Sequence, residues 1–159
     1  MTLAAGTQVR GLAVSGDACS AGPMDADDAR AFLGDHHRAV IATFRPDGRP
    51  QLSPVTVAVD DEGYVAISSR ETAFKVRNLR RDPRASLCVL DNGFFGRWIY
   101  VEGRATIVSL PQAMEPLVDY YRAVSGEHPD WDDYRQAMVR DRRVIVRIAI
   151  DRAGPDRYG

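Results

Sequence analysis

Cysteine and histidine are scarce in this sequence: its 159 residues include two cysteines and three histidines. Cys19 lies in a stretch of small residues and Cys88 in a predicted strand, so we expect no disulfide between them. His36 and His37 are adjacent, so they point in different directions and lack the i, i+4 spacing of a helical metal pair. The sequence therefore predicts neither a disulfide framework nor a metal centre.

Long apolar runs are also missing. No stretch approaches the roughly 18 residues that a membrane-spanning helix needs, and Arg10 and Asp17 interrupt any apolar core of a signal peptide. The formal net charge is −1, whereas proteins that bind nucleic acids generally carry a strong basic excess. Together with unpaired cysteines, these absences predict a cytoplasmic protein that binds neither membranes nor nucleic acid.

The common catalytic motifs are absent as well. The sequence has no Gly-x-Ser-x-Gly elbow, no His-Glu-x-x-His, no Cys-x-x-Cys and no Gly-rich dinucleotide loop. A Rossmann fold is therefore not expected, and we predict no catalytic residue. If the protein is an enzyme, a bound cofactor carries the reaction while the chain binds and orients it.

The pattern of strands and turns predicts one domain over residues 24–159, preceded by a flexible extension over residues 1–23 that is rich in small residues. Strands are expected over 39–44, 50–59, 64–68, 84–90, 97–108 and 144–150. Asp25 is predicted to cap a first helix, and Pro111 and Asp130 to begin the last two. This order predicts a mainly β fold, a six- to seven-stranded antiparallel barrel with peripheral helices.

A basic helix is predicted between the strands that end near Ser68 and begin near Arg84. Six basic and two acidic side chains lie from Arg70 to Arg84, in a chain whose total charge is −1. Ser68 with Glu71 has the spacing of a capping box, and Thr72 is a second possible N-cap. Clustered basic groups either form a solvated face or bind an anion, and both interpretations stay open.

Lys75 favours the second interpretation. It lies in the first turns of the predicted helix, where free N–H groups and the positive end of the helix dipole attract anions. Ser68 and Ser69 form the turn beside it, and Asn78 lies on the same flank as Lys75. The spacing predicts a phosphate site at this helix start.

Pro54 marks the strand over 50–59 as an edge or a bulge, because proline cannot donate to a β-ladder. The polar half of this strand, Gln51 to Pro54, then has backbone groups free to bond a planar heterocycle, unless solvent alone meets them. On the long strand over 97–108, Trp98 and Tyr100 share one face. These aromatics could stack on a ring or pack against another subunit.

Four segments of the sequence resemble one known family: Asp47 to Val55, Lys75 to Ser86, Val101-Glu102-Gly103, and Gly126 to Arg135. In this order they resemble the flavin/deazaflavin oxidoreductases of the pyridoxamine-phosphate-oxidase-like split-barrel superfamily. The similarity is greatest to the mycobacterial-type branch that uses coenzyme F420, and it covers about residues 25 to 150.

The resemblance implies a split β-barrel of the FMN-binding type, assembled as a homodimer with a cofactor at each interface. Reduced F420 would transfer hydride to a small electron-poor acceptor. The resemblance places the deazaflavin against one strand and its phosphate and acidic tail on the basic helix, with two aromatic side chains nearby from either subunit. The residues implied are Gln51, Ser53, Pro54, Val55, Thr56, Ser68, Ser69, Lys75, Arg77, Asn78, Trp98 and Tyr100.

Three alternatives remain from the sequence. The first is an FMN-dependent oxidase or flavin-binding protein of the same fold, although Pro50 to Thr56 lacks the basic side chains expected beside FMN. The second is a non-catalytic F420 carrier. The third is an RNA-binding module that uses the basic helix.

Overall fold

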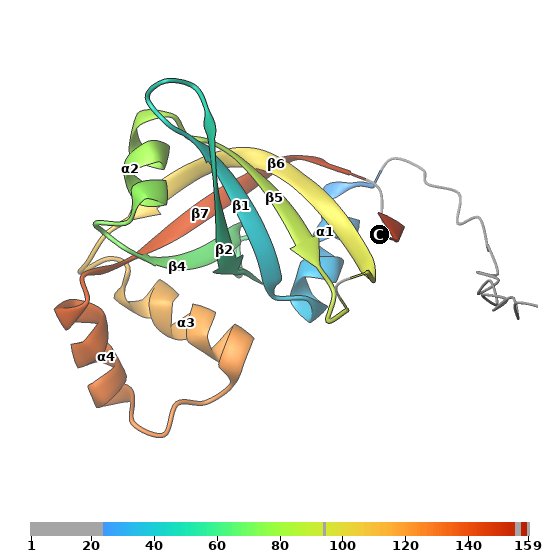
Figure 1. The fold of residues 1–159 in the computed structure, drawn as a ribbon. Coiled ribbons are helices and arrows are strands. Elements are labelled where there is room, and N and C mark those ends of the chain that lie inside the picture. Colours follow the sequence, from blue (N-terminus) through green and yellow to red (C-terminus); the bar gives the residue numbers. More distant parts are fainter. Residues whose placement is uncertain (1–23, 94, 155–156, 159) are drawn as a thin grey trace, which may run out of the picture.

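The computed structural model describes residues 24–93, 95–154 and 157–158 (Figure 1); the predicted extension over 1–23, with Cys19, lies outside them. The helices are α1 (Ala26–Asp35), α2 (Phe74–Arg81), α3 (Met114–Ser125) and α4 (Trp131–Arg140). The strands are β1 (Arg38–Phe44), β2 (Pro50–Thr56), β3 (Ala58–Val59), β4 (Val65–Arg70), β5 (Arg84–Leu90), β6 (Arg97–Val108), β7 (Arg143–Ala153) and β8 (Arg157–Tyr158).

The strands form one antiparallel sheet in the order β2-β1-β5-β6-β7-β4-β3, and β8 pairs with β6. The first and last strands of this order, β2 and β3, are separated in the chain by Val57 alone. The Cα atoms of Thr56 and Ala58 can therefore lie no more than about 7 Å apart, so the sheet must curl into a barrel. This confirms the predicted fold and the position of Pro54 on an edge strand.

The predicted strand over 50–59 is interrupted at Val57. The Val57 N–H donates to the His37 carbonyl at 2.8 Å, and the chain then leaves β1 to pair with β4. Beyond this point β2 and β4 do not pair, which leaves an opening in the side of the barrel between these two strands.

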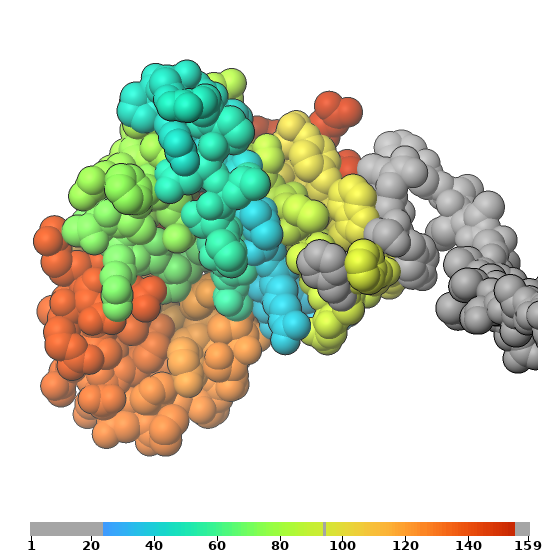
Figure 2. Space-filling model, viewed as in Figure 1, coloured from blue at the N-terminus to red at the C-terminus, as the bar shows by residue number. Residues whose placement is uncertain are grey.

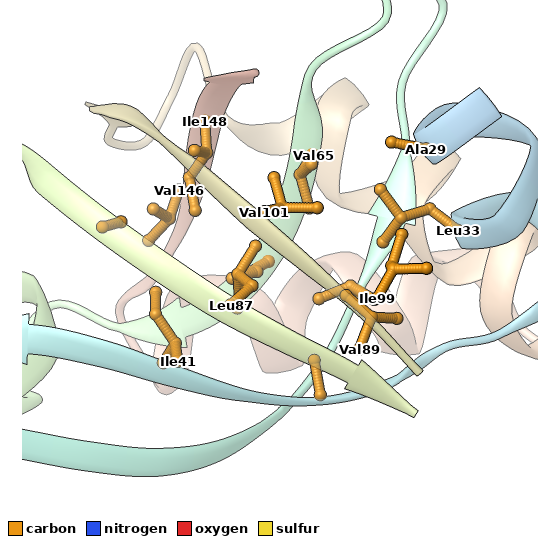
Figure 3. Close-up of a cluster of buried hydrophobic side chains, with 14 of the residues drawn as sticks. Ala29, Leu33, Ile41, Val65, Leu87, Val89, Ile99, Val101, Val146 and Ile148 are labelled. Carbon is orange, nitrogen blue, oxygen red and sulfur yellow. The ribbon is translucent and has the colours of Figure 1, made fainter. Parts of the chain in front are cut away.

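The barrel interior holds the main core. Residues alternate between the two faces of each strand, and in β5 the buried members are Ala85, Leu87 and Val89. Figure 3 shows Leu87 and Val89 pointing toward apolar side chains from the other strands and from α1. The apolar face of α2, with Val76 and Leu79, packs into the same core.

Two of the predicted helix caps are confirmed. The Asp25 carboxylate accepts hydrogen bonds from the N–H groups of the first turn of α1, and Asp130 does the same for α4. The predicted capping box of α2 is wrong: its N-cap is Ala73, with no side-chain hydrogen bond. Ser68 instead lies inside β4, and the Glu71 carboxylate pairs with Arg80.

Helices α3 and α4 form a separate helical lobe against one side of the barrel (Figure 1). A second apolar cluster, with Leu117 and Tyr134 at its centre, packs the lobe on Ala66 of β4 and Ile145 of β7. Pro111 does not begin α3 as predicted. The chain first makes a turn in which the Met114 N–H donates to the Pro111 carbonyl, and the helix begins at Met114.

Two predicted absences can be compared with the described part of the chain. No helix there is long and apolar enough to cross a membrane. No three His, Cys, Asp or Glu side chains within residues 24–93, 95–154 and 157–158 gather as a metal site would require.

Candidate functional site

A cleft of about 750 Å³ lies between the opening in the barrel and the helical lobe. One side, here called the barrel wall, consists of Pro54, Val55, Thr56, Ser68 and Lys75. The opposite side, here called the lobe wall, consists of Tyr120, Tyr121, Val124, Ser125, Tyr134 and Met138. Arg143, at the start of β7, completes the lining. In Figure 2 the green surface of the α2 region lies above the orange surface of the lobe.

The barrel wall brings together five of the residues predicted from the sequence. Pro54, Val55 and Thr56 come from β2, Ser68 comes from β4 and Lys75 comes from the first turn of α2. The edge strand and the basic helix start therefore face one cleft, as a shared cofactor site requires. Their individual roles stay predictions.

Tyr120 shows which backbone groups face the opening. Its hydroxyl donates to the Thr56 carbonyl at 3.0 Å, so Thr56 directs its backbone away from β1. Alternate residues of a strand direct their backbone groups to the same side, so Leu52 and Pro54 also present theirs at the open edge. Of the four residues from Gln51 to Pro54, only these two have backbone groups that are not directed toward hydrogen-bond partners on β1.

Three other predicted residues make contacts within the protein and do not line the cleft. Ser69 and Asn78 are buried, and the Asn78 side-chain amide donates to Thr43 Oγ1 at 3.1 Å and to Gln51 Oε1 at 2.9 Å. These bonds join α2 to β1 and β2 beneath the cleft. Asn78 and Gln51 thus fix the position of the barrel wall, without lining it.

The remaining predicted residues lie away from the cleft within one chain. Arg77 is exposed, with its guanidinium 5.6 Å from the centre of the Phe74 ring. Ser53 is half-buried on β2, opposite Ile41 of β1. Trp98 and Tyr100 lie on β6, which is three strands from β2 in the sheet.

The cleft has a positive charge that no carboxylate balances. Burial lowers the pKa of Lys75, and the nearby Arg143 charge lowers it further. Neither side chain forms an ion pair within the described residues, and the buried Arg143 Nε has no hydrogen-bond partner among them. Two cations line the cleft and no carboxylate does, so the cleft suits an anionic ligand.

The start of α2 adds two backbone donors. Ala73 provides no side-chain cap, and within the described residues the N–H groups of Phe74 and Lys75 have no hydrogen-bond acceptor. The positive end of the helix dipole lies at the same point. Backbone donors and an ammonium group at one helix start are a typical phosphate-binding arrangement.

The lobe wall and Arg143 were missed by the sequence analysis. Burial raises the pKa of Tyr120, and it raises the pKa of Tyr134 to about 12, so both phenols stay protonated near neutral pH. No local pattern in the sequence of α3 indicates that its tyrosines face the barrel opening. Arg143 had no sequence signal beyond its place before an apolar strand.

Comparisons with known proteins agree with this fold. The chain is 29% identical over 127 residues to the F420H(2)-dependent biliverdin reductase of Mycobacterium tuberculosis (strain CDC 1551 / Oshkosh), covering 79% of this chain and 84% of the relative. A conserved hypothetical protein from M. tuberculosis has a similar crystal structure, with a TM-score of 0.68 and 28% identity, covering 83% of this chain and 84% of that chain.

A solved F420 reductase shares the fold at a TM-score of 0.61 and 22% identity, covering 79% of this chain and 94% of that chain. The family model described as pyridoxamine 5'-phosphate oxidase matches residues 26–154. That range includes every element from α1 to β7 and both walls of the cleft. The chain belongs to the pyridoxamine 5'-phosphate oxidase family, as its sequence motifs indicated.

Proposed function

We propose that the protein is an F420-dependent oxidoreductase that passes hydride from reduced F420 to a small, electron-poor organic acceptor. One observation carries the proposal: Lys75 and the unpaired edge of β2 line the same cleft. The F420H(2)-dependent reductase among its relatives supports this cofactor.

The residues of the barrel wall fit such a ligand. Lys75 and the free N–H groups at the start of α2 would hold the phosphate, with Ser68 as a neighbouring hydroxyl donor. The free backbone groups of Leu52 and Pro54 would bond the polar edge of the ring system. When bound, the reduced deazaflavin supplies the hydride, so the chain needs no nucleophile or metal of its own.

Cofactor binding tests the proposal directly. We expect the purified protein to bind added F420 at micromolar concentrations or below, measured by the change in F420 fluorescence on titration. Reduced F420 should then be oxidised in the presence of a quinone acceptor. The absence of binding at micromolar F420 would contradict the proposal.

FMN is the second candidate, because the family is described by an oxidase and not by an F420 enzyme. The cofactor bound to the purified protein distinguishes the two candidates. A yellow protein that releases FMN on denaturation would favour the oxidase, whereas a nearly colourless protein that binds added F420 would favour the reductase.

We also infer a homodimer, formed through the outer face of the sheet. Strand register places Pro54, Val40, Cys88 and Tyr100 in one row across β2, β1, β5 and β6, on the face opposite the barrel core. None of these four belongs to the buried core, and the row ends at the edge of the cleft. A second copy on this face would bring its aromatic side chains toward the cleft.

Molar mass measured by light scattering tests this inference. We expect twice the chain mass for the wild type, and a shift to one chain mass when Tyr100→Glu places a charge on this face. A monomeric wild type would contradict the dimer and leave the F420 proposal to be judged by its own titration.

A further inference from the structure

Arg143 is a charged residue of the cleft that the proposed function leaves without a role. Its Nε is buried and has no hydrogen-bond partner among the described residues. Guanidinium groups bind carboxylates through paired hydrogen bonds in a fixed fork geometry. The Arg143 side chain as a whole is half-buried and lines the cleft, so a ligand with an acceptor group could pair with its guanidinium there.

The position of Arg143 is fixed by the backbone before it. Arg142 adopts a φ of 51°, in the left-handed region that non-glycine residues rarely occupy. Its carbonyl accepts a hydrogen bond from the Glu71 N–H at 2.9 Å. This contact joins the start of β7 to the connection between β4 and α2. Arg142 directly follows the C-cap of α4, a position at which a left-handed residue commonly ends a helix.

Arg143 lies at the junction of the two walls. Its charge lowers the pKa of Lys75 on one side, and acts in the same direction on the phenols of Tyr120 and Tyr134 on the other. The helix-start donors lie with Lys75, whereas the aromatic surface lies with Tyr120 and Tyr134. A second ligand packed on the lobe wall would therefore lie within reach of the Arg143 charge.

We propose that Arg143 determines acceptor specificity by binding a carboxylate of the acceptor, which is a planar conjugated acid packed on the lobe wall. The proposal rests on the proposed function, in which Lys75 and the α2 start hold the cofactor. Aromatic side chains pack well against flat rings, and the guanidinium selects those rings that carry a negative group. Arg143 touches the acceptor in this arrangement and leaves the cofactor to Lys75.

A matched pair of acceptors tests the proposal: anthraquinone-2-carboxylate and its methyl ester. Both are flat, electron-poor quinones, and only one is charged. Dissociation constants are measured by tyrosine and tryptophan fluorescence quenching, with and without F420. We expect the wild type to bind the acid about 10- to 100-fold more tightly than the ester, the scale of one charged hydrogen-bonded pair.

The variants are Arg143→Gln, Arg143→Lys and, as a control, Arg140→Gln on the exposed end of α4. Arg143→Gln should remove the preference for the acid and leave the affinity for the ester unchanged. Arg143→Lys should keep part of the preference, and Arg140→Gln all of it. Affinity for F420 should stay within about twofold of wild type in each variant, with folding checked by circular dichroism.

Three results would overturn the proposal. The first is a wild type that shows no preference for the acid or binds neither quinone. The second is an Arg143→Gln variant that keeps the preference. The third is an Arg143→Gln variant whose F420 binding is weakened as much as that of Lys75→Ala. The last result would assign Arg143 to the cofactor phosphate. Failure of the wild type to bind F420 at all would instead refute the proposed function, while the preference between acid and ester would still be measured.

Discussion

The two walls of the cleft differ in how the chain builds them. The barrel wall consists mainly of an edge strand and a helix start, and the groups proposed to bind the cofactor there are largely backbone atoms plus Lys75. The lobe wall consists of side chains from α3 and α4, held in place by apolar packing and by hydrogen bonds that include those from Tyr134 to the Leu117 carbonyl and from Tyr120 to the Thr56 carbonyl.

This difference separates what each wall can recognise. Backbone groups and a helix start meet any ligand that has the right polar edge and phosphate, so the barrel wall suits a cofactor that does not vary. Side chains of the lobe can change without disturbing the sheet. We therefore expect acceptor choice to depend on the lobe wall and on Arg143.

The largest expected effect comes from loosening one wall and sparing the other. Leu117 and Leu87 are both fully buried, the first under the lobe and the second in the barrel core. Either leucine changed to alanine should cost about 2–5 kcal/mol of unfolding free energy, measured in urea.

Only Leu117→Ala should also weaken binding of anthraquinone-2-carboxylate to the folded protein, because Leu117 supports the helix that carries Tyr120. Equal loss of quinone affinity in Leu87→Ala would show that the two walls are not independent.

The next effect concerns charge on the barrel wall. Lys75→Ala should weaken F420 binding by about 1–3 kcal/mol, the scale of a lost charged hydrogen bond. Arg77→Ala, two residues along the same helix but exposed beside Phe74, should change it less. Fluorescence titration of both variants provides the measurement. The reverse order of affinities would place the phosphate on the outer face of α2.

A smaller effect concerns the hydrogen bond inside the lobe. The Tyr134 hydroxyl donates to the Leu117 carbonyl at 2.8 Å, so Tyr134→Phe should lower the unfolding free energy by about 1 kcal/mol. The Tyr121 hydroxyl has no hydrogen bond within the described residues, and Tyr121→Phe should stay within about 0.5 kcal/mol of wild type. Equal losses would mean that the bond between the helices contributes little.

The most gradual effect is that of pH on F420 binding. Burial lowers the pKa of Lys75 below its usual 10.5, and a phosphate binds the protonated form. Affinity should therefore be highest below the folded-state pKa of Lys75 and decline as the pH rises through it. In Lys75→Ala this alkaline decline should disappear; its persistence would assign the titration to another group.

Without ligand, the lowered pKa of Lys75 makes the pH dependence of protein stability opposite to that of F420 binding. The unfolded chain holds the Lys75 proton more tightly than the folded chain, so the unfolding free energy should rise with pH between the folded-state pKa and 10.5. Urea titrations of the wild type and of Lys75→Ala across the alkaline range would measure the difference.

The sequence was informative where a residue's local chemistry dictates its structure. Pro54 placed β2 at an edge, Asp25 and Asp130 placed two helix starts, and Lys75 marked the barrel wall. The capping box failed because β4 continues through Ser68 to Arg70 and α2 begins only at Phe74, while the Glu71 carboxylate pairs with Arg80.

The lobe wall depends on contacts that no local pattern contains. Tyr120 reaches Thr56 over 64 residues of chain, and Arg143 comes to the cleft from β7, at the far end of the chain from β2. In α3, Leu117 and Val118 are buried in the lobe core. The same helix also presents Tyr120 and Tyr121 to the cleft, a second role that spacing alone cannot reveal.

The single residue between β2 and β3 has a consequence for how ligand range evolves in this fold. Val57 alone joins β2 to β3, the two edge strands of the sheet. The length of this connection therefore limits how far the opening between β2 and β4 can widen. One inserted residue there would widen the entrance while both flanking strands kept their partners. Natural or engineered length changes at this point should therefore alter which ring systems enter, with the rest of the barrel unchanged.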